Sequence, residues 1–102
     1  MQSTLTSKRM PFVIRETYTV ELEYNEEHAI IHLPSVSKFN KTVYKDMKSV
    51  VDDVKSFLLS AGYQEVWAVA KPEDILMQKL VRRFGYEYRA TAEGYDVFSV
   101  RT

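Results

Sequence analysis

The chain has 102 residues, a length typical of one domain, and we expect residues 1–102 to fold as a single unit. It carries 14 basic and 14 acidic residues, so no net charge draws the whole molecule to nucleic acid or to a membrane surface. It has no cysteine, which excludes disulfides, thiolate metal sites and cysteine nucleophiles. The longest apolar run covers only residues 66–70 and residues 1–10 have no apolar core, so we expect a cytoplasmic protein without a membrane partner.

The first third of the chain predicts two strands behind a polar arm. Residues 1–10 are polar and rich in Ser and Thr, which is typical of a flexible tail. Apolar and polar residues alternate over 17–24, which predicts a strand with one wet face, and this strand could begin as early as Phe12. Residues 29–33 predict a more buried strand. Pro34 should end it, because proline has no N–H to donate to the ladder.

A long amphipathic helix and a buried strand come next. Apolar residues recur at spacings of three and four over 43–61, which predicts a helix that Asn40 or Thr42 caps and Gly62 ends. Residues 65–70 are apolar at successive positions, so we expect a central strand that is covered on both faces.

The last third predicts a second helix and two more strands. Pro72 suits the first turn of the helix, and Gly85 should end it. Two strands follow at residues 86–90 and 95–100. The predicted class is therefore α/β (α+β): a mixed sheet in the order β-β-α-β-α-β-β, with both helices packed on it.

Two segments carry a resemblance to a known family. They are residues 61–70, AGYQEVWAVA, and residues 80–88, LVRRFGYEY. They resemble the late strand, the following helix and the leucine-tyrosine-x-x-x-glycine-phenylalanine ending of the GNAT superfamily of N-acetyltransferases. The resemblance extends over residues 17–100. This sequence shows no counterpart of the family's first strand and first two helices. It implies a short, phage-type or degenerate member with a GNAT-like fold.

The resemblance implies acetyl-CoA as the cofactor, held near the start of the long helix. Three lysines, Lys38, Lys41 and Lys45, surround that helix start, where bound phosphate would offset their repulsion by the helix dipole. The alternative is that they are ordinary solvated lysines beside a helix cap. The implied cofactor-binding residues are Leu33, Ser35, Ser37, Lys38, Asn40, Lys41 and Thr42.

Three positions differ from the family's functional pattern. The loop at 37–42 has no glycine, Val81 stands where a general-acid tyrosine often stands, and Asp74 stands where an asparagine is common. Two functions therefore stay open. One is an acyl-CoA-binding domain with weak N-acetyltransferase activity towards an unknown amine, on a small molecule or a protein. The other is a non-catalytic binding or assembly protein, phage-encoded or associated with a virion.

His32 is the one candidate for a catalytic base, because imidazole accepts protons near neutral pH and His32 lies near the end of the strand that binds acyl-CoA in the family. The alternative is a partly buried polar residue without chemistry. No third ligand is spaced to join His28 and His32, so no metal site is expected.

Two expectations concern partners. The strands carry more apolar side chains than two helices can cover, which predicts a homodimer, with the strand at 95–100 as a contact surface. The final strands also carry aromatic side chains beside Arg89 and Arg101, namely Tyr86, Tyr88, Tyr95 and Phe98. These could stack on bases, but the zero net charge makes a nucleic-acid partner unexpected.

Overall fold

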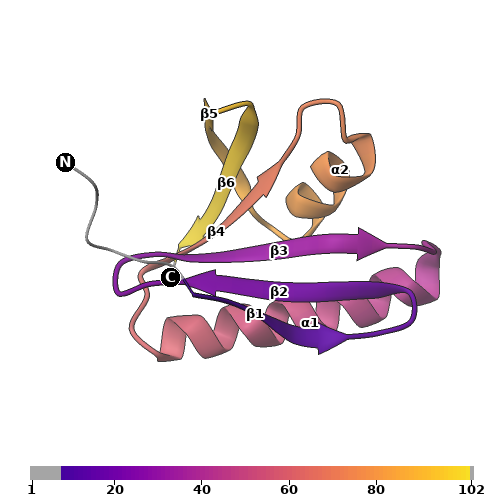
Figure 1. Ribbon diagram of the computed structural model, residues 1–102, viewed down its shortest axis with the longest axis horizontal. Helices are drawn as coiled ribbons and strands as arrows, with labels where there is room; N and C mark the ends of the chain where they lie inside the picture. Colours follow the sequence, from indigo (N-terminus) through magenta and orange to yellow (C-terminus); the bar gives the residue numbers. More distant parts are fainter. Residues whose placement is uncertain (1–7, 102) are drawn as a thin grey trace.

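The computed structural model of the protein describes residues 8–101, which form a six-stranded sheet and two helices (Figure 1). The strands stand in the spatial order β1-β2-β3-β4-β6-β5. The predicted mixed α+β sheet with a GNAT-like arrangement is confirmed, and one strand is added, so the order is β-β-β-α-β-α-β-β. The elements are β1 (Lys8–Ile14), β2 (Tyr18–Tyr24), β3 (Ala29–Val36), α1 (Lys41–Ser60), β4 (Glu65–Ala70), α2 (Ile75–Arg83), β5 (Glu87–Ala92) and β6 (Tyr95–Arg101).

The added strand, β1, corrects the prediction of a flexible arm over residues 8–10; residues 1–7 of that arm lie outside the described residues. β1 pairs antiparallel with β2 and is interrupted by a bulge between Pro11 and Val13. Almost all of its residues are exposed, because it lies at the edge of the sheet. An edge strand that is exposed on both faces shows no alternation of apolar and polar residues, so the usual signal was missing.

β3 runs through Pro34 and ends at Val36, so the prediction that Pro34 stops the strand is wrong. The ladder with β2 is irregular here: His32 pairs with Glu21 and Ser35 with Thr19, while Pro34 has no partner in the register. Proline is tolerated at such an irregularity because its missing N–H removes no ladder hydrogen bond.

The two helices begin at side-chain caps. The Val43 N–H donates to Asn40 Oδ1 over 2.9 Å at the start of α1, and the Met77 N–H donates to Asp74 Oδ1 over 3.1 Å at the start of α2. Pro72 therefore precedes α2, and the prediction that it lies in the first turn of this helix is wrong. Gly62 follows α1 with φ +107°, a conformation that favours glycine and ends the helix as predicted.

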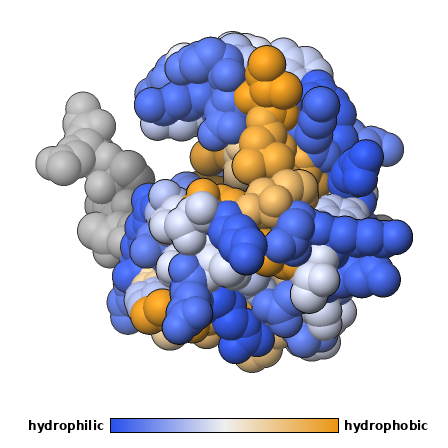
Figure 2. All heavy atoms as spheres, turned by 90° about the vertical axis from the view of Figure 1, so that its right-hand side faces the viewer, coloured by the Kyte–Doolittle hydropathy of each residue, from blue (hydrophilic) through white to orange (hydrophobic). Residues whose placement is uncertain are grey.

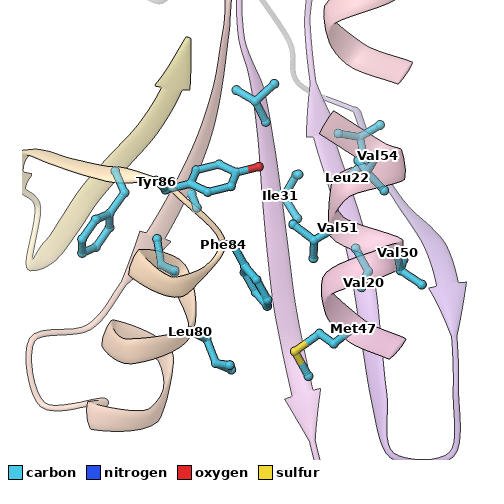
Figure 3. Close-up of a cluster of buried hydrophobic side chains, with 14 of the residues drawn as sticks. Val20, Leu22, Ile31, Met47, Val50, Val51, Val54, Leu80, Phe84 and Tyr86 are labelled. Atoms are coloured by element: carbon cyan, nitrogen blue, oxygen red, sulfur yellow. The ribbon is translucent and has the colours of Figure 1, made fainter. Parts of the chain in front are cut away.

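The core lies on one face of the sheet only. In β4 the buried residues are Val66, Ala68 and Ala70, and the residues between them are half-buried, so the expectation that β4 is covered on both faces is wrong. Side chains of both helices pack on that one face (Figure 3). This follows from the chain path, because right-handed crossovers from β3 to β4 and from β4 to β5 place α1 and α2 on the same side. The opposite face of the sheet carries no helix within residues 8–101.

Candidate functional site

The two parallel strands at the centre of the sheet pair over a very short length. β3 and β4 meet only at Ile30 with Trp67 and at Ile31 with Ala68, and then diverge (Figure 1). Beyond these pairs, β3 is hydrogen-bonded to β2 alone and β4 to β6 alone. The facing backbone edges of residues 32–36 and 69–70 are therefore outside any ladder. We call the space between them the β3–β4 opening.

Apolar side chains form the floor of the β3–β4 opening. A small cavity of about 10 Å³ lies there, lined by Ile31 and Leu33 of β3, Ala68 of β4, and Met77, Val81 and Phe84 from the α2 side. Figure 2 looks at this end of the molecule and shows it hollowed between two lobes, with apolar residues in the hollow. An extended molecule with an apolar body could lie between the strands, with its polar groups on the free backbone edges.

The open end of the space lies at the carboxyl ends of both parallel strands, where α1 and α2 begin. Helix N-termini present free N–H groups and a positive dipole end, which favours anions. α1 has no acidic residue in its first turn, and Lys38, Lys41 and Lys45 around its start are exposed. This end of the opening is suited to a phosphate group.

The residues predicted to bind the cofactor fall into two groups. Lys38, Lys41 and Thr42 are exposed at the start of α1, Leu33 lines the floor of the opening, and Ser35 is exposed at the end of β3. The other two are already engaged within the protein. Asn40 caps α1, and the Ser37 hydroxyl donates to the Glu16 carbonyl oxygen over 3.1 Å. Ser37 and Asn40 thus hold the loop in place.

His32 is the first residue of β3 beyond the last pair with β4, and it lies on the face opposite the helices. Its Nε2 is 2.8 Å from Glu23 Oε1 of β2, and its side chain is 15% exposed. On the same face, Arg9 Nε donates to Glu21 Oε1 over 2.6 Å. A histidine that contacts a carboxylate is held in one orientation and can accept a proton on its other nitrogen.

Sequence reasoning missed two residues of this region. Glu23 lies on the wet face of the strand predicted over 17–24, and its contact with His32 spans the β2–β3 hairpin and depends on the register. Tyr86 is 3% exposed and borders the floor cavity, and its Oη is the one buried side-chain oxygen or nitrogen of residues 8–101 without a hydrogen-bond partner. Burial, with a smaller contribution from the negative charge of Asp52, raises the pKa of Tyr86, so this hydroxyl stays protonated.

Two classes of site are not seen in residues 8–101. No three His, Asp or Glu side chains in that range are grouped so that they could hold a metal ion. Neither α1 nor α2 has the length and apolar character to cross a membrane.

Comparisons with known proteins give structural neighbours only. No protein-family model matches the chain, and no curated protein sequence matches it. A domain from Methanocaldococcus jannaschii superposes with a TM-score of 0.60 at 16% identity, over 86% of this chain and 69% of that one. The anti-CRISPR protein AcrVA5 superposes with a TM-score of 0.61 at 14% identity, over 87% of this chain and 96% of that one.

A third structural neighbour is described as a member of a known family. It is a probable acetyltransferase of the GNAT family from Chromobacterium violaceum, with a TM-score of 0.56 and 14% identity. The match covers 85% of this chain and 60% of that chain, so this protein spans less than two thirds of that neighbour's length. The chain therefore has a GNAT-like fold, as the resemblance in residues 61–88 implied. At these identities the likeness concerns the fold alone.

Proposed function

We propose that the protein binds an acyl-coenzyme A in the β3–β4 opening and transfers the acyl group slowly to an amine. The observation that carries this proposal is the early end of the β3–β4 ladder after Ile31 and Ala68. It leaves two free strand edges above an apolar floor, on which the amides and methylenes of a pantetheine arm could lie. Such a break in a sheet costs backbone hydrogen bonds, and a ligand that replaces them would offset that cost.

The phosphates would lie at the start of α1. Within the first turn, Asn40 already accepts from the Val43 N–H, which leaves the N–H groups of Lys41 and Thr42 for a ligand. Lys38 and Lys41 would add charge-assisted contacts. Since the loop has no glycine, side chains rather than closely approaching backbone would supply much of the phosphate binding, and we expect weak affinity.

The amine would approach from the face opposite the helices, where His32 lies. Acetyl-CoA supplies a thioester carbonyl, and a free backbone N–H near Leu33 would stabilise the oxyanion that develops on it. His32 would take the proton from the amine as its nitrogen bonds to the acyl carbon, and Glu23 would hold the imidazole in place. As the carbon–sulfur bond breaks, the thiolate would take its proton from water. Val81, which stands where the family often has a general-acid tyrosine, has no acidic proton.

Calorimetric titration with acetyl-CoA tests binding. We expect a dissociation constant in the high micromolar range, weakened about tenfold or more by the double substitution Lys38→Ala with Lys41→Ala. The matched control is Lys55→Ala with Lys79→Ala, which removes the same charge away from the start of α1. Equal weakening by both pairs would show that net charge, not this site, binds the ligand. The absence of heat at millimolar acetyl-CoA would overturn the proposal.

A second candidate function is binding without catalysis. It is favoured by valine at position 81, which cannot protonate the departing thiolate. A measurable affinity for acetyl-CoA with no transfer to amines above the solution rate would favour it. Loss of transfer in His32→Ala with unchanged affinity would instead support catalysis.

A further inference from the structure

A second apolar feature lies far from the β3–β4 opening along the sheet, between the edge strand β1 and the C-terminal half of α1. It is a groove of about 330 Å³, which we call the β1–α1 groove. Met10 and Phe12 of β1 form one side, Phe57 and Leu58 of α1 form the other, and Tyr24 and Tyr63 close one end. The rings of Phe12 and Phe57 lie next to each other across it, tilted by 45°, with centroids 6.5 Å apart.

Large apolar side chains of the β1–α1 groove are exposed to solvent. Met10 is 46% exposed, Phe12 39% and Phe57 57%. A fully exposed side chain of this size has about 200 Å² of solvent-accessible surface, so the three together expose roughly 300 Å². Tyr24, Tyr63 and Ala61, which also border the groove, bring the patch to roughly 400 Å². A patch of this size that lies on two adjacent elements points to a protein interface.

The free edge of β1 is poorly suited to pairing with another strand. Pro11 has no N–H, the bulge after it breaks the regular spacing, and Lys8 and Arg9 place charge at the edge. These are the features by which edge strands avoid strand addition. A partner at this surface would therefore contact the side chains over the groove instead of pairing with β1.

We propose that the β1–α1 groove is the interface of a two-fold homodimer, in which Phe57 of each copy packs into the groove of the other. The groove and the exposed Phe57 ring belong to the same patch, which is what a self-complementary two-fold contact requires. A standard interface buries about 800 Å² per partner, of which a little over half is apolar, so it needs about 450 Å² of apolar surface. The patch supplies close to that area.

Charge also permits this contact. The chain has no net charge, so two copies do not repel each other at long range. The rim carries both signs, with Lys8 on β1 and Asp53 one turn before Phe57 on α1. A two-fold axis can place the basic rim of one copy near the acidic rim of the other.

Light scattering after size exclusion tests the proposal on the full chain. We expect a mass of twice the 11.9 kDa chain at about 100 μM, falling towards the chain mass on dilution. Phe57→Lys and, independently, Met10→Lys should shift the dimer dissociation constant upwards by at least tenfold, with far-ultraviolet circular dichroism unchanged. The matched control is Ile75→Lys on α2, since Ile75 is 67% exposed and lies outside the groove.

Two results would overturn the proposal. One is a mass of 11.9 kDa for the parent chain across the micromolar range up to about 500 μM. The other is a dimer that Tyr95→Lys on β6 disrupts and Phe57→Lys leaves intact, which would place the contact on the final strands as the sequence had suggested. Neither result bears on acyl-CoA binding.

Discussion

The rings of Tyr44 and Phe84 are stacked and nearly parallel, with centroids 5.9 Å apart and planes inclined by 5°. Tyr44 lies in the first turns of α1, and Phe84 is the residue that caps the end of α2. The guanidinium carbon of Arg83 lies 5.9 Å from the centre of the Tyr44 ring. The stack therefore joins the start of one helix to the end of the other, beside the floor of the β3–β4 opening.

The first prediction concerns this stack. Phe84 is 6% exposed, so Phe84→Ala should lower the free energy of unfolding by about 3–5 kcal/mol. Tyr44→Ala should cost less, because Tyr44 is only half-buried. A double-mutant cycle from urea denaturation should give a coupling of about 0.5–1.5 kcal/mol between the two rings. Strict additivity would mean that the stack contributes nothing beyond the burial of each ring.

The second prediction concerns the apolar face of α1. Val50 is 7% exposed and belongs to the core, so Val50→Asp would place an unpaired carboxylate among apolar side chains and cost about 4 kcal/mol or more. We expect the variant to lose its cooperative thermal transition. Ser49→Asp is the control, because it adds the same charge at the neighbouring exposed position. A melt of Val50→Asp that matches the control would mean that another face of α1 is buried.

The third prediction concerns acid stability and Glu65. The Ser99 hydroxyl donates to its Oε2 over 2.6 Å and Arg101 Nε over 2.8 Å, and these contacts lower the pKa of Glu65 below its usual 4.5. The unfolded chain therefore binds a proton at this residue more readily than the folded one. The contribution of Glu65 is complete above about pH 4.5 and is lost as pH falls through the lowered value.

Urea denaturation at pH 6 and pH 3 checks this prediction. Glu65→Gln should lose less stability between the two pH values than the parent chain. Glu73→Gln, at an exposed residue before α2, should behave like the parent. A parent-like pH dependence in Glu65→Gln would contradict the role given to the Ser99 and Arg101 contacts.

The parts of the fold with regular periodicity could be predicted from the sequence. The spacing over residues 43–61 and Gly62 located α1, and the final hairpin was placed to within two residues at each end. β1 could not be predicted, because it is exposed on both faces and shows no alternation. Pro34 was misleading, because only the register with β2 shows that it falls where no ladder partner is needed.

The candidate site was predicted less completely than the fold. The lysines at the start of α1 are visible in the sequence, because they run against the preference of a helix N-terminus. The early separation of β3 and β4 is not visible in the sequence. Residues 29–33 and 65–70 both have the pattern of ordinary strands, and their divergence depends on how the halves of the sheet pack. The contact of His32 with Glu23 likewise depends on tertiary register.

Titration of the ¹⁵N-labelled protein with acetyl-CoA, followed by amide chemical shifts, tests the central claim most directly. We predict that the amides of Leu33, Ser35, Lys41, Thr42 and Val69 shift together and saturate with one affinity, because they border the β3–β4 opening and the start of α1. Amides of β1 and of the C-terminal half of α1 should not move. Shifts confined to those latter elements, or no shifts at millimolar ligand, would contradict the assignment of this opening as an acyl-CoA site.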